Sequence, residues 1–179
     1  MRFSIVVPSY NQAAFLPACI ASVLGQEGVD LEVLVYDGGS TDGSRRIIEE
    51  HADRLAFWQS QADGGQAAAL RAGFERAAGD VFGWLNSDDL LLPGALAKVE
   101  TFLEAHPDTA LAYGDAIWID AAGEVLRPKR EIDFDWKVFA YGYCFLAQPA
   151  CFFPRAAYEA VGGIDPRFET CMDYDLWHR

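Results

Sequence analysis

Short apolar runs alternate with helix-period segments through the first half of the chain, and this alternation restricts the possible fold more than any other feature of the sequence. Four runs have the length of strands and few polar residues: Phe3–Val7, Leu31–Tyr36, Leu55–Gln59 and Val81–Leu85. Such runs are typical of parallel strands, which are buried on both faces because helices cover both sides of the sheet. The sequence therefore predicts an α/β/α sandwich.

Helices are predicted between these strands, each with its apolar residues on one face. Gly25, Gly64-Gly65 and His106-Pro107 mark helix ends or turns. The first two helices have apolar faces of Leu16, Ile20, Val23 and Leu24, and of Ile47 and Ile48; Thr41 or Asp42 is expected to cap the second. The next two have apolar faces of Leu70, Phe74 and Ala77, and of Leu96, Val99, Phe102 and Leu103. Pro93 is expected in the first turn of the last helix. Crossover helices of this kind are what parallel strands require.

After residue 107 the pattern changes to that of antiparallel strands. Residues 110–119 and 125–126 are apolar and flank the turn residues Ala122-Gly123, which indicates a hairpin. No linker separates the two halves. We therefore predict one domain over residues 1–179, with a mixed, mainly parallel central sheet and a small antiparallel addition in the second half.

The formal net charge of -13 argues against a nucleic-acid-binding protein, because such proteins use Lys and Arg to displace phosphate counterions. An acidic chain can still bind phosphates through a metal ion. No segment has the apolar length of a signal peptide or membrane helix, so we expect a cytoplasmic protein. Its four cysteines lack metal-ligand spacing and are expected to be buried thiols.

Polar residues collect directly after each of the four predicted strands. In open α/β sheets, ligands bind beyond the carboxyl ends of the strands, where these loops converge. The four clusters are Pro8-Ser9-Tyr10-Asn11, Asp37-Gly38-Gly39-Ser40-Thr41-Asp42, Asp63-Gly64-Gly65-Gln66 and Asn86-Ser87-Asp88-Asp89. Their common position predicts a single polar crevice at this edge of the sheet.

Asp88 and Asp89 form the most distinctive pair in that crevice. Two adjacent carboxylates repel each other unless solvent or a cation separates them. Mg²⁺ commonly takes one or two protein carboxylates and completes its shell with water and substrate phosphates. The alternative interpretation is a simple turn and helix cap, because Asn, Ser and Asp all favour such positions.

In combination, these segments resemble the family-2 glycosyltransferases, which have the GT-A fold, a Rossmann-like α/β/α sandwich. The resemblance extends from Phe3 to Arg179, and four segments carry it: Ile5–Asn11, Asp37–Ser44, Trp84–Asp89 and Met172–Trp177. Two positions depart from the family pattern. Gly38 stands where a second acid is common, and Asn86 replaces the first Asp of the D-x-D segment.

The resemblance implies a donor site in the first half, about residues 1–106, and an acceptor and catalytic half over about 107–179. Asp88 takes the metal-binding position for Mg²⁺ or Mn²⁺. The residues implied to contact the nucleotide-sugar are Pro8, Ser9, Tyr10, Asp37, Gly38, Gly65, Gln66, Asn86, Ser87 and Asp88. Arg71 is a further candidate, although a solvated helix residue is the simpler interpretation.

Asp173 matches the catalytic base of the family, with Met172 in place of the usual Glu. Asp89, Asp175 and Trp177 are weaker candidates for the acceptor side. Alternatively, Asp173 and Asp175 mark a helix start, where carboxylates favour the positive end of the macrodipole, and Trp177 packs inward. Three further aromatic residues would provide either a sugar-stacking platform or core contacts: Trp136, Tyr141 and Tyr143.

The implied activity is inverting transfer of a sugar from a nucleoside diphosphate, with a UDP-sugar favoured, to an acceptor hydroxyl. The acceptor would be a saccharide or lipid-linked saccharide in polysaccharide or glycoconjugate synthesis. Association with the inner face of the membrane would require an anchor beyond Arg179, in a region where relatives often have further sequence. Two alternatives remain, a noncatalytic nucleotide-sugar-binding protein and a nucleotidyltransferase. A nucleotidyltransferase usually has a basic, glycine-rich triphosphate loop near the first strand, and residues 8–11 form no such loop.

Overall fold

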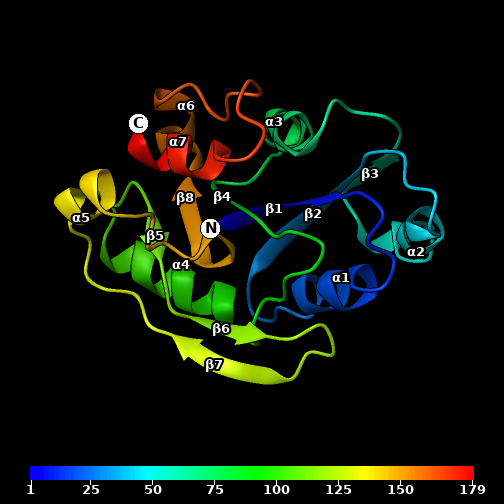
Figure 1. Ribbon diagram of the computed structural model, residues 1–179, viewed down its shortest axis with the longest axis horizontal. Coiled ribbons are helices and arrows are strands. Elements are labelled where there is room, and N and C mark those ends of the chain that lie inside the picture. The colour runs from blue at the N-terminus through cyan, green and yellow to red at the C-terminus, as the bar shows by residue number, and fades with distance from the viewer.

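The computed structural model describes residues 1–179 as a six-stranded sheet with helices on both faces (Figure 1). The strands lie in the order β3-β2-β1-β4-β8-β5; the first four are parallel, and β8 is antiparallel to both of its neighbours. Their bounds are β1 Arg2–Ser9, β2 Asp30–Asp37, β3 Phe57–Ser60, β4 Val81–Trp84, β5 Ala112–Tyr113 and β8 Cys151–Pro154. The predicted α/β sandwich with a mixed, mainly parallel sheet is confirmed.

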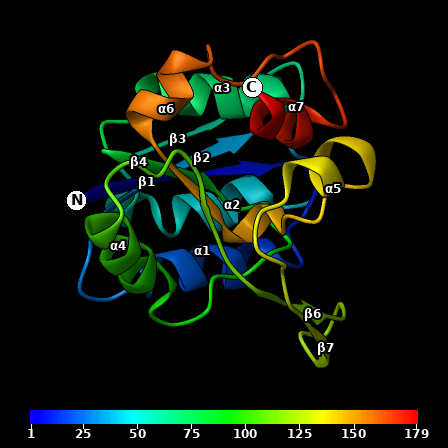
Figure 2. The ribbon, with the colours of Figure 1, turned by 90° about the vertical axis from the view of Figure 1, so that its left-hand side faces the viewer.

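The helices form two layers. Helices α3, α6 and α7 cover one face of the sheet, and α1, α2 and α4 cover the other, as the two perpendicular views agree (Figure 1 and Figure 2). The helix bounds are α1 Leu16–Leu24, α2 Ser44–Glu49, α3 Gln66–Arg76, α4 Ala95–Ala105, α5 Trp136–Tyr141, α6 Arg155–Ala160 and α7 Met172–His178; short 3-10 turns span Ala52–Arg54 and Gln148–Ala150. None of these helices combines the length and apolar character required to span a membrane.

Alternate residues of the central strand β1 supply two separate cores. Phe3, Ile5 and Val7 pack into the cluster beneath α1 and α4. Val6 points the other way, into the cluster that includes Phe74 of α3 and residues of α6 and α7. Because neighbouring side chains of a strand lie on opposite faces, burial on both faces explains why the run from Phe3 to Val7 is apolar except for Ser4.

Helix α3 approaches β1 so closely that Gly73 has no room for a side chain. A Cβ at Gly73 would lie 2.5 and 2.9 Å from the two methyl carbons of Val6, which is fully buried. We expect Gly73→Ala to lower the free energy of unfolding by about 1–2 kcal/mol, because overpacking outweighs the gain in helix propensity of at most ~1 kcal/mol. Urea denaturation would measure the change.

A second substitution tests whether Val6 is the cause. Val6→Ala removes the two methyl carbons, so Gly73→Ala should cost clearly less stability in the Val6→Ala background than in the natural chain. An equal cost in both backgrounds would show that the close approach of α3 to β1 is not the reason.

The second half differs from its prediction in how the strands pair. The hairpin forms from β6 (Ala116–Ile119) and β7 (Val125–Lys129), but Ala112–Tyr113 pairs with β8 instead of joining it. Strand β8 itself was not predicted, because its four residues carry no alternation and prolines lie at both ends, Pro149 and Pro154. The hairpin lies outside the main sheet (Figure 2).

Two helix starts also differ from prediction. Gly43, with a positive φ of 103°, occupies the N-cap of α2, while Asp42 accepts a hydrogen bond from the Ser44 N–H. Helix α4 begins after Gly94, which is also left-handed, so Pro93 lies just before the helix and not in its first turn. Glycine takes both positions because left-handed backbone carries no steric cost without a Cβ.

Several side chains expected to be buried are exposed. Cys19 and Cys151 are buried, but Cys144 and Cys171 are exposed, so the expectation of buried thiols is wrong for two of the four. The core interpretation is also wrong for three aromatic residues, which are 57–81% exposed: Trp136, Tyr141 and Tyr143.

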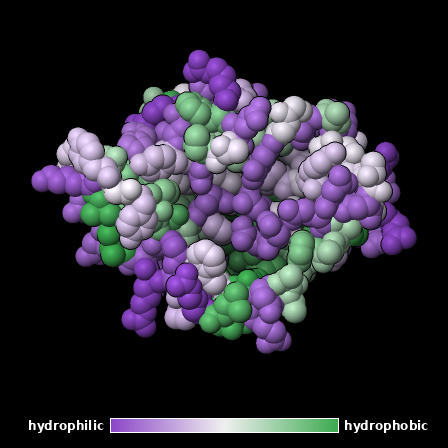
Figure 3. Space-filling model, in the orientation of Figure 1, coloured by the Kyte–Doolittle hydropathy of each residue, from purple (hydrophilic) through white to green (hydrophobic).

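In the face shown in Figure 3, hydrophobic side chains gather along the lower edge, over the β6–β7 hairpin.

Candidate functional site

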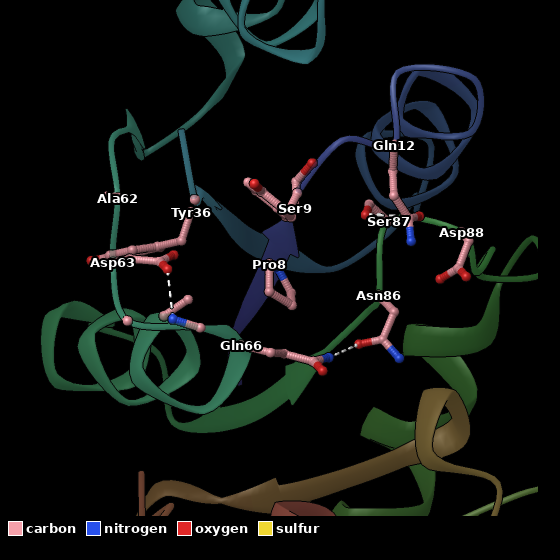
Figure 4. A pocket seen from close by; sticks show the side chains of 15 residues that line it. Pro8, Ser9, Gln12, Tyr36, Ala62, Asp63, Gln66, Asn86, Ser87 and Asp88 are labelled. Carbon is pink, nitrogen blue, oxygen red and sulfur yellow. Dashed lines mark hydrogen bonds between the residues drawn. The ribbon is translucent and has the colours of Figure 1, made fainter. Parts of the chain in front are cut away.

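The loops that follow β1 to β4 enclose a cavity of about 610 Å³ at the carboxyl edge of the parallel strands (Figure 4). Nine of the residues predicted to contact a nucleotide-sugar line it: Pro8, Ser9, Tyr10, Gly38, Gly65, Gln66, Asn86, Ser87 and Asp88. The remaining lining residues are Gln12, Tyr36, Ala62, Asp63, Gly64 and Ala69. Parallel strand ends thus bring four separate sequence clusters to one place.

Asp37 was predicted to contact the ligand, but it does not line the cavity. Its side chain is fully buried and accepts hydrogen bonds from the backbone N–H groups of Gly39 and Ser40 and from the hydroxyls of Ser40 and Ser60. A buried carboxylate needs such partners. Asp37 therefore stabilises the loop that carries Gly38, and its oxygens are already engaged.

The loop after β1 is held against the loop after β2. The Asn11 side chain accepts a hydrogen bond from the Thr41 N–H at 2.9 Å, and the Ser40 hydroxyl accepts one from the Asn11 N–H at 2.7 Å. Asn11 is the only non-glycine residue with a positive φ, 53°. Asn tolerates this conformation, which explains the residue at this turn.

Gly38 gives two cavity side chains room to approach each other. A Cβ at this position would lie 3.3 Å from both the Tyr10 ring and an Asp63 carboxylate oxygen. The Asp63 carboxylate also accepts a hydrogen bond from the Gly65 N–H at 2.9 Å (Figure 4). Asp63 therefore places a carboxylate beside the position where the family commonly has a second acid.

Ser9 leaves an unsatisfied polar atom at the cavity wall. Its hydroxyl oxygen is buried and has no hydrogen-bond partner in the protein. Buried hydroxyls are costly without a partner. The geometry therefore leaves Ser9 Oγ free to bond a ligand atom.

The two adjacent carboxylates have different environments. Asp88 is exposed, lines the cavity and has no hydrogen bond or ion pair to its carboxylate. Asp89 lies outside the cavity lining; its burial and the neighbouring Asp88 charge raise its pKa to about 6. Burial disfavours the charged carboxylate and is the larger cause, and the Asp88 charge adds to it. Of these two adjacent carboxylates, only Asp88 lines the cavity.

Asp173 lines a second cavity of about 190 Å³ that adjoins the first. It begins α7, next to Met172, whose side chain is buried in the core between α3 and α7. Gln66 and Asn86 line both cavities, which makes them a shared wall. The second cavity is completed by Trp84, Gln148, Thr170 and Met172.

The weaker acceptor-side candidates lie elsewhere. Asp175 forms an ion pair with Arg179 at 2.7 Å, and Trp177 stacks on Trp84 with ring centroids 5.3 Å apart. Neither lines either cavity, because both face the packing around α7. Arg71 likewise pairs with Glu75 and donates to the Ile164 carbonyl. These three side chains have structural partners in place of a ligand.

Sequence reasoning missed several lining residues, among them Gln12, Tyr36 and Gln148. Tyr36 belonged to a predicted strand and was interpreted as core, and its hydroxyl does bond the Ala72 carbonyl. Gln12 and Gln148 carry no local pattern that distinguishes them from solvated glutamines. Only the position of Gln12 directly after the first polar cluster could have indicated its place.

The two adjoining cavities lie at the carboxyl edge of a mainly parallel sheet, which is where open α/β proteins bind their ligands. The model of the family described as "Glycosyl transferase family 2" matches residues 4–160. The chain therefore belongs to glycosyl transferase family 2.

Curated relatives agree with this assignment. The chain is 32% identical over 178 residues to the "PGL/p-HBAD biosynthesis glycosyltransferase" of Mycobacterium tuberculosis, covering 97% of this chain and 67% of the relative. It is 33% identical to an uncharacterized glycosyltransferase from Nostoc, covering 93% of this chain and 55% of the relative. The chain thus spans between half and two thirds of these relatives.

Solved structures share the fold at lower sequence identity. The 1-349 chain of S. aureus TarS in complex with UDP-GlcNAc superposes with a TM-score of 0.72 at 16% identity, covering 98% of this chain and 52% of that TarS chain. The mannosyltransferase PcManGT of Pyrobaculum calidifontis, in complex with GDP-Man and Mn²⁺, gives a TM-score of 0.66 at 22% identity, covering 98% of this chain and 51% of that protein. Both confirm the GT-A fold.

Proposed function

We propose that this chain transfers a sugar from a nucleoside diphosphate, with UDP favoured, to a hydroxyl of a saccharide or lipid-linked saccharide, with inversion at the anomeric carbon. One observation carries the proposal: the larger cavity, which contains Asp88, and the smaller one, which contains Asp173, share Gln66 and Asn86 as a wall. This arrangement gives a donor and an acceptor adjoining places with a carboxylate in each.

The larger cavity suits a nucleotide in size and in lining. Its volume of about 610 Å³ falls in the usual range for small-molecule sites. The exposed Tyr10 ring offers a stacking face, and Ser9 Oγ offers an unpartnered hydroxyl. TarS and PcManGT, which bind UDP-GlcNAc and GDP-Man, support a nucleotide-sugar donor here.

The residues present also fit a divalent cation bound together with the donor. The protein has no cluster of three or more acidic, His or Cys side chains that could hold a metal alone. The unpaired Asp88 carboxylate in the cavity matches the one or two protein ligands that Mg²⁺ takes when phosphates complete its shell. When bound, Mg²⁺ or Mn²⁺ supplies positive charge that stabilises the leaving diphosphate.

In the proposed reaction, Asp173 removes the proton from the acceptor hydroxyl as its oxygen attacks the anomeric carbon. The bond from that carbon to the diphosphate oxygen breaks, and the nucleoside diphosphate leaves on the opposite side. Attack from the face opposite the leaving group inverts the configuration. Asp173 suits this role because it lines the smaller cavity, away from Asp88.

Calorimetric titration with UDP and with GDP, each with and without Mn²⁺, tests the donor site. We expect one nucleotide to bind at least about tenfold more tightly with Mn²⁺, because Asp88 would hold the cation and the cation would offset the charge of the diphosphate. Slow release of the same nucleotide from its sugar form then distinguishes an enzyme from a noncatalytic binding protein. Absence of binding to either nucleotide under all conditions would contradict the proposal.

A further inference from the structure

Three side-chain amides form a continuous chain across the wall between the two cavities. Gln66 Nε2 donates to Asn86 Oδ1 at 2.6 Å, and Asn86 Nδ2 donates to Gln148 Oε1 at 3.2 Å. Gln148 Nε2 donates in turn to the backbone carbonyl of Trp84 at 2.9 Å. Figure 4 shows the first link, with Gln66 of α3 and the Asn86 side chain that follows β4 reaching toward each other below Pro8.

The direction of this chain is fixed at its Trp84 end. A backbone carbonyl only accepts hydrogen bonds, so Gln148 must turn its NH₂ group toward Trp84. Gln148 Oε1 then faces Asn86 and accepts a hydrogen bond from the Asn86 NH₂ group. Asn86 Oδ1 consequently faces Gln66 and accepts a hydrogen bond from the Gln66 NH₂ group. Gln66 Oε1 is consequently the oxygen left without a partner, at the wall that both cavities share.

This direction explains why Asn, and not the family's usual Asp, suits position 86. A carboxylate at this position could accept from Gln66 but could not donate to Gln148. Its second oxygen would face Gln148 Oε1, and two acceptors would oppose each other in a half-buried place. Asn86 and Gln148 are therefore a matched pair, joined across 62 residues of sequence.

We propose that this amide chain presents Gln66 Oε1 as a hydrogen-bond acceptor for a hydroxyl or amide N–H of the donor sugar, and that Gln148 is the positioning residue that fixes its orientation. The inference rests on the proposed function, which places the nucleotide in the larger cavity and the sugar toward Asp173. It assigns a role in donor-sugar recognition to Gln148, which does not line the larger cavity.

The test uses Gln148→Met and Gln66→Met, singly and together, in the full chain. Turnover of UDP-glucose, UDP-N-acetylglucosamine and GDP-mannose would be measured as release of the nucleoside diphosphate. Affinity for the free nucleotide would be measured by calorimetry. We expect each single variant to lower kcat about three- to tenfold, because this factor corresponds to the net free energy of one or two hydrogen bonds. Affinity for the free nucleotide should change less than about twofold, because the base and diphosphate contacts are untouched.

Non-additivity distinguishes a positioning role from separate local damage. If Gln148 acts through Gln66, the double variant should lose no more turnover than the worse single variant. Gln61→Met is the matched control, because Gln61 is exposed and its side chain makes no hydrogen bond; its turnover should equal that of the natural chain. Asn86→Asp should also lower turnover at saturating Mn²⁺, although it introduces the family's usual residue.

Each other outcome overturns the inference. Three results would show that the amide chain does not orient the sugar: unchanged turnover in Gln148→Met, additive losses in the double variant, or faster turnover in Asn86→Asp. In each case, retained nucleotide binding would leave the proposed function standing. Loss of free-nucleotide affinity in Gln148→Met would show general damage to the site. Absence of nucleotide binding by the natural chain would remove the proposed function and this inference together.

Discussion

Asp173→Asn is expected to lower turnover by about 10²–10⁴-fold, because an amide cannot accept the proton that the acceptor hydroxyl must lose. Donor affinity should remain within about twofold, since Asp173 lies in the smaller cavity and not in the larger one. Loss in kcat without loss of donor binding is the pattern of a group that acts only in the transition state. Single-turnover transfer to an acceptor, with calorimetry of the donor nucleotide, measures the two effects separately.

Asp108→Asn provides the matched control for this variant. Asp108 is exposed, lines neither cavity and makes no side-chain hydrogen bond, so the same chemical change there should leave turnover unchanged. If Asp173→Asn instead weakens donor binding or lowers thermal stability with little change in kcat, Asp173 serves the start of α7 and another group is the base.

Asp88→Asn should show the opposite pattern, a loss of metal-dependent binding. The amide keeps one ligand oxygen but removes the negative charge, so Mn²⁺-dependent nucleotide affinity should fall at least about tenfold. Affinity measured without Mn²⁺ should change little or rise, because the carboxylate repels the diphosphate when no cation separates them. Titrations of one nucleotide with and without Mn²⁺ give both values.

The same Asp108→Asn variant controls for a general effect of removing one negative charge from an acidic chain. Equal Mn²⁺ dependence in Asp88→Asn and in the natural chain would show that Asp88 is not the cation ligand. Asp89→Asn would then be the next variant to titrate, because Asp89 is the adjacent carboxylate.

The parallel half of the fold could be predicted because its pattern is local and repeated. Each of β1 to β4 is an apolar run followed by a polar cluster, and each predicted cluster contributes lining residues to one cavity. Strand ends that share an edge converge through backbone geometry alone. Nine of the ten residues predicted to contact the donor therefore line one cavity, and their contact with a donor stays a prediction.

The remaining site residues depend on contacts that no local pattern encodes. Asp37 sits in a polar cluster like its neighbours, and only the structure shows its oxygens turned inward to Ser40 and Ser60. Trp177 was a weak acceptor-side candidate with inward packing as the alternative, and it packs on Trp84, a partner that local sequence does not identify. Gln148 reaches the site only because β8 pairs with β4, a long-range antiparallel pairing outside the predicted hairpin.

The position of β8 also determines how the chain can be divided. It lies between β4 and β5, so the second half of the sequence supplies the last two strands of the sheet, β8 and β5, and covers the edge of β4. A fragment ending near residue 106 would leave β4, whose residues are all buried, as an open edge with unpaired backbone groups. We expect such a fragment to aggregate, and we expect residues 1–179 to unfold as a single cooperative unit.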